Sequence, residues 1–186
     1  MLFICTSKEI SEKYMPKNLN FSDEWHVDET VIKISGKRYY IWTLIDSETR
    51  FVLDWYLTSS RQAASAFHLF PKVKDNFGSP LSIVSEKLPS YTIPTKIVFN
   101  EAKHIKVQSW FDNIINNLIK NFFKRFKHKY KTCHGFKSET FIQMLLQGFF
   151  FFYNYIIPHS SLNGETHARV AGVKYSELQR SNLLFF

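Results

Sequence analysis

One aspartate and one run of basic residues have the types and spacing that could act on a phosphate-containing substrate. Asp28 lies within residues 25–34, a stretch of β-branched, aromatic and interleaved polar residues that predicts a β-strand. Aspartate is depleted in strands, and a carboxylate presented from a strand is a suitable ligand for the divalent ions of a phosphoryl-transfer site. The alternative is an outward-facing, hydrated side chain, because isolated acidic residues usually lie on the solvated face of a sheet.

The basic run extends over residues 113–138, which contain seven Lys or Arg residues and no Asp or Glu. Apolar side chains recur on one face at helical spacing, so we predict an amphipathic helix over residues 112–131. Helix faces that only contact solvent usually mix both signs of charge. This run has one sign, with Tyr130, His134 and Phe136 interleaved, as at many surfaces that contact a phosphate backbone. We therefore predict nucleic-acid contact, with a solvated helix face as the alternative.

The composition of the whole chain limits the class of protein. Its 186 residues fit one domain with at most a short appendage, and 45% hydrophobic residues allow a substantial core, which excludes an intrinsically disordered protein. The formal net charge of +8 favours an anionic partner. Cys5 and Cys133 form no Cys-x-x-Cys pair, which argues against a zinc knuckle and fits a reducing compartment. No signal peptide is recognisable, so we expect a soluble, cytoplasmic protein.

The elements that must position Asp28 and the basic helix follow from the periodicity of the sequence. The stretches that read as strands are residues 25–34, 38–45, 51–57, 81–84 and 95–99, with a helix predicted over residues 63–77. The first three strands are joined by short loops, which predicts an antiparallel meander. Alternating helices and strands follow, so we predict an α/β fold with a mixed sheet and helices packed on it.

Residues 139–157 are apolar enough to raise the question of a membrane span. Gln143, Gln147 and Asn154 interrupt the run, and no uninterrupted apolar stretch approaches the roughly 20 residues that a bilayer requires. We therefore predict a buried helix that ends at Pro158.

Five segments together resemble the DDE-type transposases of insertion sequences, and in particular insertion-sequence family six. They are Trp-His-Val-Asp-Glu-Thr from Trp25, Asn116-Asn117, Gly135-Phe-Lys-Ser138, the Tyr-Asn-Tyr-Ile-Ile-Pro-His-Ser-Ser-Leu-Asn-Gly segment from Tyr153, and Ala171-Gly-Val173. The resemblance covers about residues 25–173 and keeps the family's motif order. It implies a ribonuclease-H-like fold, with a mixed five-stranded sheet whose first three strands are antiparallel and which helices flank. It also implies DNA as partner, both transposon ends and target, and a homo-oligomer assembled on DNA.

The resemblance further implies a catalytic site. Such enzymes clamp two divalent ions, Mg²⁺ or Mn²⁺, between two Asp and one Glu, and the ions activate the attacking oxygen and stabilise the leaving oxygen. Carried over to this sequence, the first ligand is Asp28, and the second position, normally the Asp of a Thr-Asp pair, is Glu86. The third position, on the basic helix shortly after Asn117, holds Lys120 instead of an acid. The implied metal ligands that remain are Asp28 and Glu86.

Both departures are expected to impair catalysis. The longer side chain of Glu86 displaces its oxygens by about 1 Å, which an octahedral Mg²⁺ site tolerates poorly and which can cost about 10²-fold in rate. Lys120 places an ammonium group where a metal ion should bind, and we expect it to pair with Asp28 or Glu86. The basic surface that would still contact DNA comprises Lys124, Arg125, Lys127, Lys129, Lys131 and Lys137.

The resemblance also sets the expected domain organisation. Residues 25–158 are predicted to be the catalytic, integrase-like domain, residues 159–186 a C-terminal tail, and residues 1–24 a connector. Family members usually carry a small DNA-binding region before the catalytic domain. The 24 residues before Trp25 are too few for one, so we expect a truncated, catalytically impaired copy. Two other interpretations stay open: a DNA-binding module that has lost the chemistry, and a remnant without function.

Overall fold

The structure, a computed structural model, describes residues 19–86, 88–107, 117–132 and 136–175. The chain divides into two compact units, Ser22–Ser138 and Glu139–Phe186, and the second unit also includes Met1–Phe21. Helix α5 (Glu139–Tyr155) therefore groups with the C-terminal elements rather than with the sheet. The predicted domain boundary at residue 158 stays a prediction.

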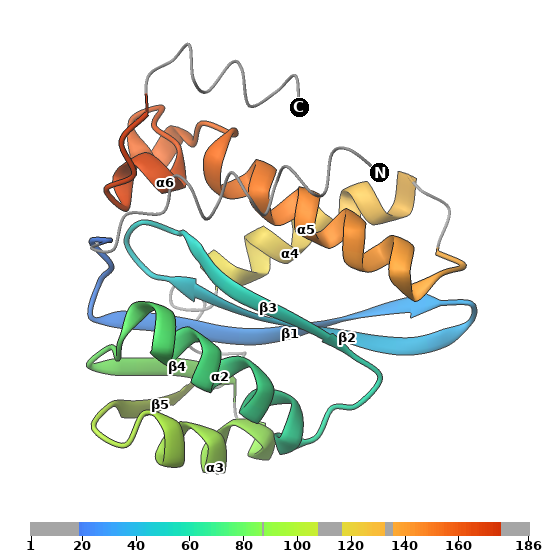
Figure 1. Cartoon of the computed structure of the whole chain (residues 1–186), viewed down its shortest axis with the longest axis horizontal. Coiled ribbons are helices and arrows are strands. Elements are labelled where there is room, and N and C mark those ends of the chain that lie inside the picture. The colour runs from blue at the N-terminus through green and yellow to red at the C-terminus, as the bar shows by residue number, and fades with distance from the viewer. Residues whose placement is uncertain (1–18, 87, 108–116, 133–135, 176–186) are drawn as a thin grey trace. The chain divides into compact units, whose positions relative to one another are not determined.

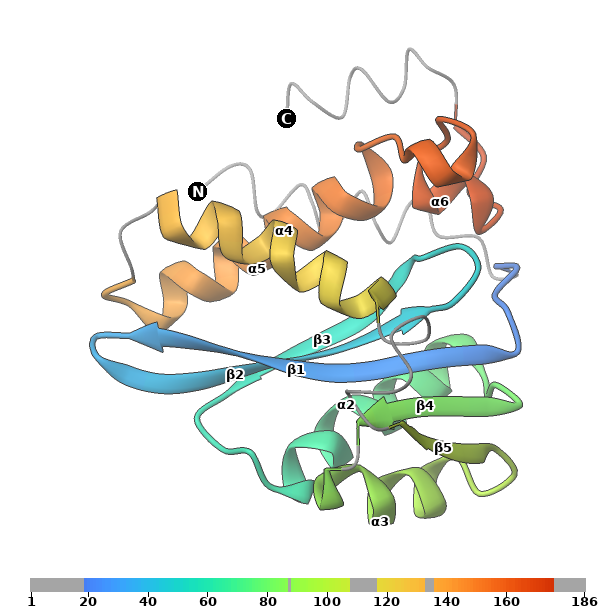
Figure 2. The same cartoon turned by 180° about the vertical axis from the view of Figure 1, so that it is seen from behind.

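The first unit is built on a five-stranded mixed sheet, shown from opposite sides in Figures 1 and 2. Its strands are β1 (Glu24–Ile34), β2 (Lys37–Asp46), β3 (Val52–Thr58), β4 (Ser82–Glu86) and β5 (Lys103–Val107), in the spatial order β3-β2-β1-β4-β5. Strands β1 to β3 pair antiparallel, while β4 runs parallel to both β1 and β5. The predicted fold class is confirmed: a mixed five-stranded sheet of the ribonuclease-H-like kind, with its first three strands antiparallel.

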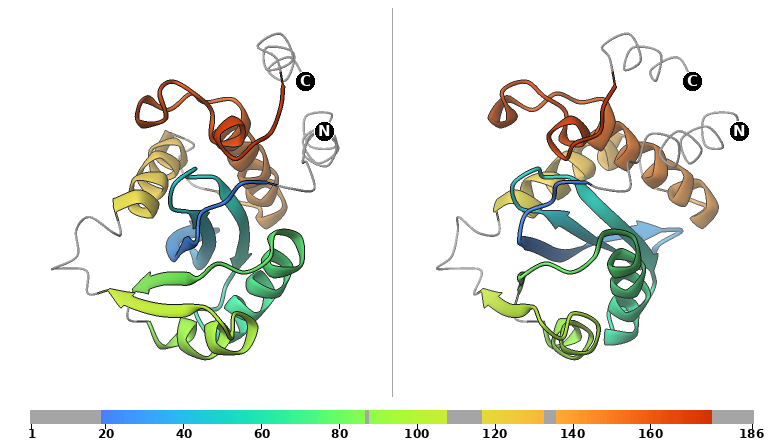
Figure 3. Two further views of the ribbon diagram at one scale, coloured as in Figure 1. Left: turned by 90° about the vertical axis from the view of Figure 1, so that its left-hand side faces the viewer. Right: turned by 60° about the vertical axis from the view of Figure 1, so that its left-hand side comes forward.

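Helices cover both faces of this sheet (Figure 3). Helices α2 (Ala63–Phe77) and α3 (Pro89–Val98) pack against each other and against one face, and α4 (Asn117–Thr132) packs against β1 on the other. Since side chains alternate between the faces of a strand, Trp25 and its odd-numbered neighbours in β1 face α2 and α3. Trp25 packs edge-on against Phe99, with ring centroids 6.0 Å apart. The even-numbered residues of β1, including Asp28, face α4.

The strand predicted over residues 95–99 is wrong. Residues 95–98 belong to α3, which begins with Pro89 at a position where a missing backbone N–H is tolerated. The Thr95 hydroxyl donates a 2.7 Å hydrogen bond to the Tyr91 carbonyl one turn earlier, and both side chains are buried on one helix face. The fifth strand lies farther along the chain, at Lys103–Val107. Its β-branched and apolar residues were too few to predict it, because only two of five are Ile or Val.

The second unit contains α5, a 3₁₀ turn (Ser160–Leu162) and the short helix α6 (His167–Val170). A buried chain of hydroxyl groups fixes its C-terminal segment: the Tyr175 hydroxyl donates to the Tyr155 carbonyl at 2.9 Å and is hydrogen-bonded to Thr166. The helix predicted over residues 139–157 is present and ends at Tyr155, but it is only partly buried, since Phe141 and Phe152 are 53% and 42% exposed. In the part of the chain that the structure describes, no helix is long and apolar enough to cross a membrane.

Candidate active site

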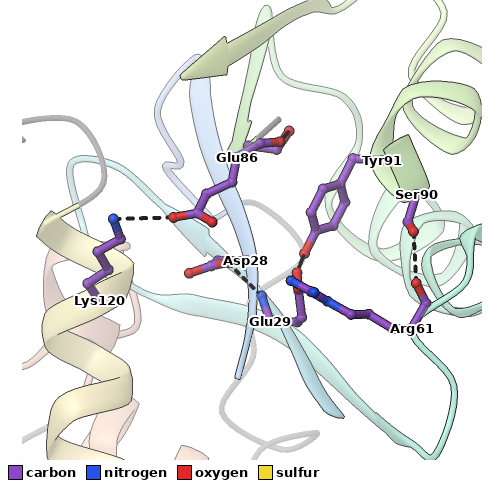
Figure 4. A network of polar contacts seen from close by, with 8 residues as sticks. Asp28, Glu29, Arg61, Glu86, Ser90, Tyr91 and Lys120 are labelled. Atoms are coloured by element: carbon purple, nitrogen blue, oxygen red, sulfur yellow. Dashed lines mark hydrogen bonds and ion pairs between the residues drawn. The ribbon is translucent and has the colours of Figure 1, made fainter. Parts of the chain in front are cut away.

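The pairing of β1 with β4 places Asp28 and Glu86 on the same face of the sheet. The parallel register pairs His26 with Val84, so the residues two positions farther along each strand project to the same side. Asp28 lies near the middle of β1, and Glu86 is the last residue of β4. Neighbouring strands lie about 4.8 Å apart, so the fold brings two acids that are distant in sequence to one point (Figure 4).

Lys120 of α4 reaches this point from the facing helix. Its ammonium nitrogen lies 3.2 Å from a carboxylate oxygen of Glu86, and Figure 4 shows the lysine directed from α4 toward both acids. The two side chains are 40% and 34% exposed, so water still reaches the ion pair. The structure thus joins all three residues that the resemblance implied, although their catalytic role stays a prediction.

Asp28 is an unusually perturbed carboxyl group. Burial, followed by the nearby charges of Glu29 and Glu86, raises its pKa from 3.8 to about 7. A 2.9 Å hydrogen bond from the Glu29 backbone N–H and the charge of Lys120 both lower the pKa without offsetting these effects. Asp28 therefore holds its proton to a higher pH than an ordinary aspartate does.

The residues present do not fit a divalent metal ion. Among the described residues no group of three His, Cys, Asp or Glu side chains could hold one. Two carboxylates face each other, and the ammonium group of Lys120 already binds one of them. A divalent ion would have to approach a fixed positive charge and compete with it for Glu86, which costs free energy in a partly buried site.

No other described acid supplies a third ligand. Glu101 is exposed in the turn between α3 and β5, next to the start of β5. Because β4 and β5 are parallel, this turn lies at the opposite end of the strands from Glu86, which ends β4. Five residues of strand separate the two ends by about 13 Å or more. Asp112 lies outside the described residues.

A second acid of β1, Glu29, anchors a polar cluster on the opposite face of the sheet, and the sequence analysis missed it. Its side chain is only 4% exposed and forms an ion pair with Arg61, whose Nε lies 2.7 Å from Glu29 Oε1. The Tyr91 hydroxyl donates to the other oxygen of Glu29, and Ser90 donates to the Arg61 carbonyl at 2.8 Å (Figure 4). The signal for this cluster was present, since two consecutive acids in one strand must face opposite sides.

Beside Glu86, Ser85 faces away from the candidate site. Its hydroxyl is hydrogen-bonded to His104 Nε2 of β5 at 2.8 Å, and the serine is fully buried. Burial and the charge of Lys106 lower the pKa of His104, which favours the neutral ring in this bond. His104 therefore ties β4 to β5 and does not reach the acidic pair.

Most of the predicted basic residues lie on the outer face of α4. Lys124, Arg125, Lys127 and Lys131 are exposed there, while Ile119, Phe122, Phe123 and Phe126 are buried on the inner face. The Lys129 side chain is outside the described residues. Lys137 is exposed but lies beyond the helix, where its carbonyl accepts a 2.8 Å hydrogen bond from the Ser35 hydroxyl. The predicted amphipathic helix is thus confirmed over its described part.

The sequence matches known transposases. The family model described as DDE domain matches residues 22–157. A transposase for the insertion sequence-like element IS431mec of Staphylococcus aureus strain Mu50 is 36% identical over 67 residues, which are 36% of this chain and 30% of that protein. The S. aureus transposase for the insertion sequence element IS257 in transposon Tn4003 matches with the same identity and coverage. The aligned segment thus spans less than a third of the length of these relatives.

The fold matches retroviral integrases. The catalytic core domain of HTLV-2 integrase in complex with magnesium superposes with a TM-score of 0.56 at 15% identity, over 81% of this chain and 97% of that one. The catalytic core domain of BIV integrase superposes with a TM-score of 0.59 at 13% identity, over 89% of this chain and 99% of that one. At these identities the likeness shows the fold alone.

Proposed function

The chain belongs to the DDE domain family of transposases, within insertion-sequence family six, and we propose that it is a catalytically impaired transposase domain that still contacts DNA. The parent activity would be cleavage and transfer of DNA strands. The observation that carries the proposal is the 3.2 Å ion pair between Lys120 and Glu86 at the point where the acids of β1 and β4 meet.

The impairment follows from how charge is balanced at this point. Two carboxylates in a partly buried site require positive charge nearby. Here Lys120 supplies one positive charge, and the raised pKa of Asp28, about 7, favours the neutral form of that carboxyl group. The acidic pair is therefore stabilised without a divalent ion. Phosphodiester cleavage needs a group that stabilises the leaving oxygen, and one lysine held by Glu86 is a weak substitute for a pair of metal ions.

Retained DNA contact is supported by α4. The charged residues on its exposed face are all positive, whereas helix faces that only contact solvent usually carry both signs of charge. Such a surface binds the phosphate backbone with little dependence on sequence. Transposon ends, target DNA and a homo-oligomer assembled on them would be the corresponding partners. If the chemistry is wholly absent, the same observation favours the second candidate function, a DNA-binding module.

A paired assay tests both parts of the proposal. Affinity for a short DNA duplex is measured at several salt concentrations, and nicking of supercoiled plasmid is followed with Mg²⁺ and with Mn²⁺. We expect salt-sensitive binding and no nicking above a protein-free control. Metal-dependent nicking would contradict the impairment, and the absence of DNA binding at low salt would contradict DNA contact.

A further inference from the structure

The closed end of the β1–β2 hairpin carries cations that the sequence analysis did not single out. Lys33, Lys37 and Arg38 are all exposed, and residues 30–45 contain no Asp or Glu. In Figure 1 this end of the hairpin extends past α2 and α3. One sheet face is therefore open there: Val31 is 43% exposed, whereas Ile32, which points to the other face, is 2% exposed.

Lys137 belongs to the same surface, although it is distant in sequence. The Ser35 backbone N–H donates to the Phe136 carbonyl at 2.8 Å, and the Ser35 hydroxyl donates to the Lys137 carbonyl at 2.8 Å. Ile34 and Phe136 also form a parallel bridge. These contacts fix the segment after α4 beside the hairpin turn. We call Lys33, Lys37, Arg38 and Lys137 the hairpin patch.

The hairpin holds these cations on a defined backbone. Ser35 and Gly36, with φ of 48° and 78°, form the two-residue left-handed turn that matches the twist of antiparallel strands. A preformed surface loses little conformational entropy when it binds a partner. The hairpin patch is thus suited to contact a ligand without first having to fold.

The strand register places like charges opposite each other. Lys33 and Arg38 are direct cross-strand partners, and like charges in this position destabilise a hairpin. Two neighbouring cations attract an anion. A chain of phosphates fits better than a single anion, because Lys37 and Lys137 extend the positive charge around the turn.

We propose that the hairpin patch is a second DNA-contact surface, which binds the phosphate backbone. The proposal rests on the proposed function, in that DNA is the ligand. Thr132 ends α4, and Phe136 forms the bridge to the hairpin four residues later, so the Cα atoms of these two residues lie within about 15 Å of each other. Duplex DNA carries a charge about every 1.7 Å along its axis, so a phosphate backbone that passes the hairpin patch meets several of its cations.

The test compares two triple variants with the same loss of charge. The hairpin variant is Lys33→Gln with Lys37→Gln and Arg38→Gln. The control is Lys96→Gln with Lys103→Gln and Lys106→Gln, which removes three exposed cations from α3 and β5. Affinity for a short duplex is measured by fluorescence anisotropy between about 50 and 200 mM salt. We expect the hairpin variant to flatten the slope of log affinity against log salt by about two units, with little effect in the control.

Three results would overturn the proposal, and they are distinguishable. If the slope is unchanged in the hairpin variant while Lys127→Ala/Lys131→Ala weakens binding, α4 contacts DNA and the hairpin patch does not. If the control variant loses as much DNA affinity as the hairpin variant, the effect comes from net charge and not from the hairpin patch. No binding by the wild-type protein would remove the proposed function itself. Circular dichroism checks that each variant is folded. As a second measurement, the charge-reversed Lys37→Glu/Arg38→Glu variant should bind DNA more weakly still.

Discussion

The ammonium nitrogen of Lys120 lies 3.2 Å from a carboxylate oxygen of Glu86, where β4 ends beside the middle of β1. The lysine comes from a helix that is separate from both strands, so the contact depends on the packing of α4 against β1. It places a fixed positive charge beside Asp28 and Glu86, which offsets the repulsion between the two acids.

Asp28 makes the stability of the metal-free protein depend on pH. Its pKa is raised from 3.8 to about 7, so between these pH values the folded chain holds a proton that the unfolded chain has lost. The stabilisation is therefore fully present near pH 4 and is lost as pH rises toward 7, with a total of roughly 4 kcal/mol. Urea unfolding across this range should show wild type losing stability relative to Asp28→Asn. A pH-independent difference between the two proteins would show that Asp28 titrates normally.

The basic face of α4 should control the salt dependence of DNA binding. Lys127 and Lys131 are both exposed, and replacing both by Ala should flatten the slope of log affinity against log salt by about one to two units. The loss should be similar for unrelated DNA sequences, since phosphate contacts carry no sequence information. Lys96→Ala/Lys103→Ala is the matched control. An unchanged slope in the α4 variant would mean that this face contacts only solvent.

The cluster around Glu29 should stabilise the fold. Arg61→Ala leaves a 4% exposed carboxylate with Tyr91 as its remaining partner, which we expect to cost about 1–3 kcal/mol, because Arg61 itself is half exposed. The control is Lys72→Ala, which breaks a 2.7 Å pair with Asp54 in which the lysine is 63% exposed and should cost less than about 1 kcal/mol. In a Glu29→Gln background, Arg61→Ala should cost much less. Equal costs in both backgrounds would show that the two residues act independently.

Much of the fold was predictable because its strands follow simple local rules. The β1–β2 hairpin has β-branched and aromatic residues on both sides of a Ser-Gly turn, and its boundaries agree with the prediction to within one residue. The secondary structure between β4 and β5 was not predictable in this way, because Ile97, Val98 and Phe99 have strand-like composition but lie at the end of a helix that begins at Pro89. There, the packing of Tyr91 against Trp42, with centroids 5.2 Å apart, outweighs local β-propensity.

The candidate site was predictable only in part. The sequence pointed to Asp28, Glu86 and Lys120 through their place in a family pattern and predicted that Lys120 pairs with one of the two acids, but it did not say which one; the structure pairs it with Glu86. The pKa of Asp28 depends on burial and on neighbours from two strands and a helix, which no local pattern contains. The hairpin patch was missed for a similar reason, since hydrogen bonds from Ser35 bring Lys137 to the hairpin from another part of the chain.

The most direct test of the central claim, that Lys120 takes the place of a metal ion, is calorimetric titration with Mg²⁺ and Mn²⁺. Wild type should bind neither ion. Lys120→Glu should bind, and Lys120→Glu with Glu86→Asp should bind more tightly, because three crowded carboxylates gain stability when a divalent ion neutralises them. The double variant should also unfold more easily without metal and regain stability as metal is added. Metal binding by the wild-type protein equal to that of the double variant would contradict the account.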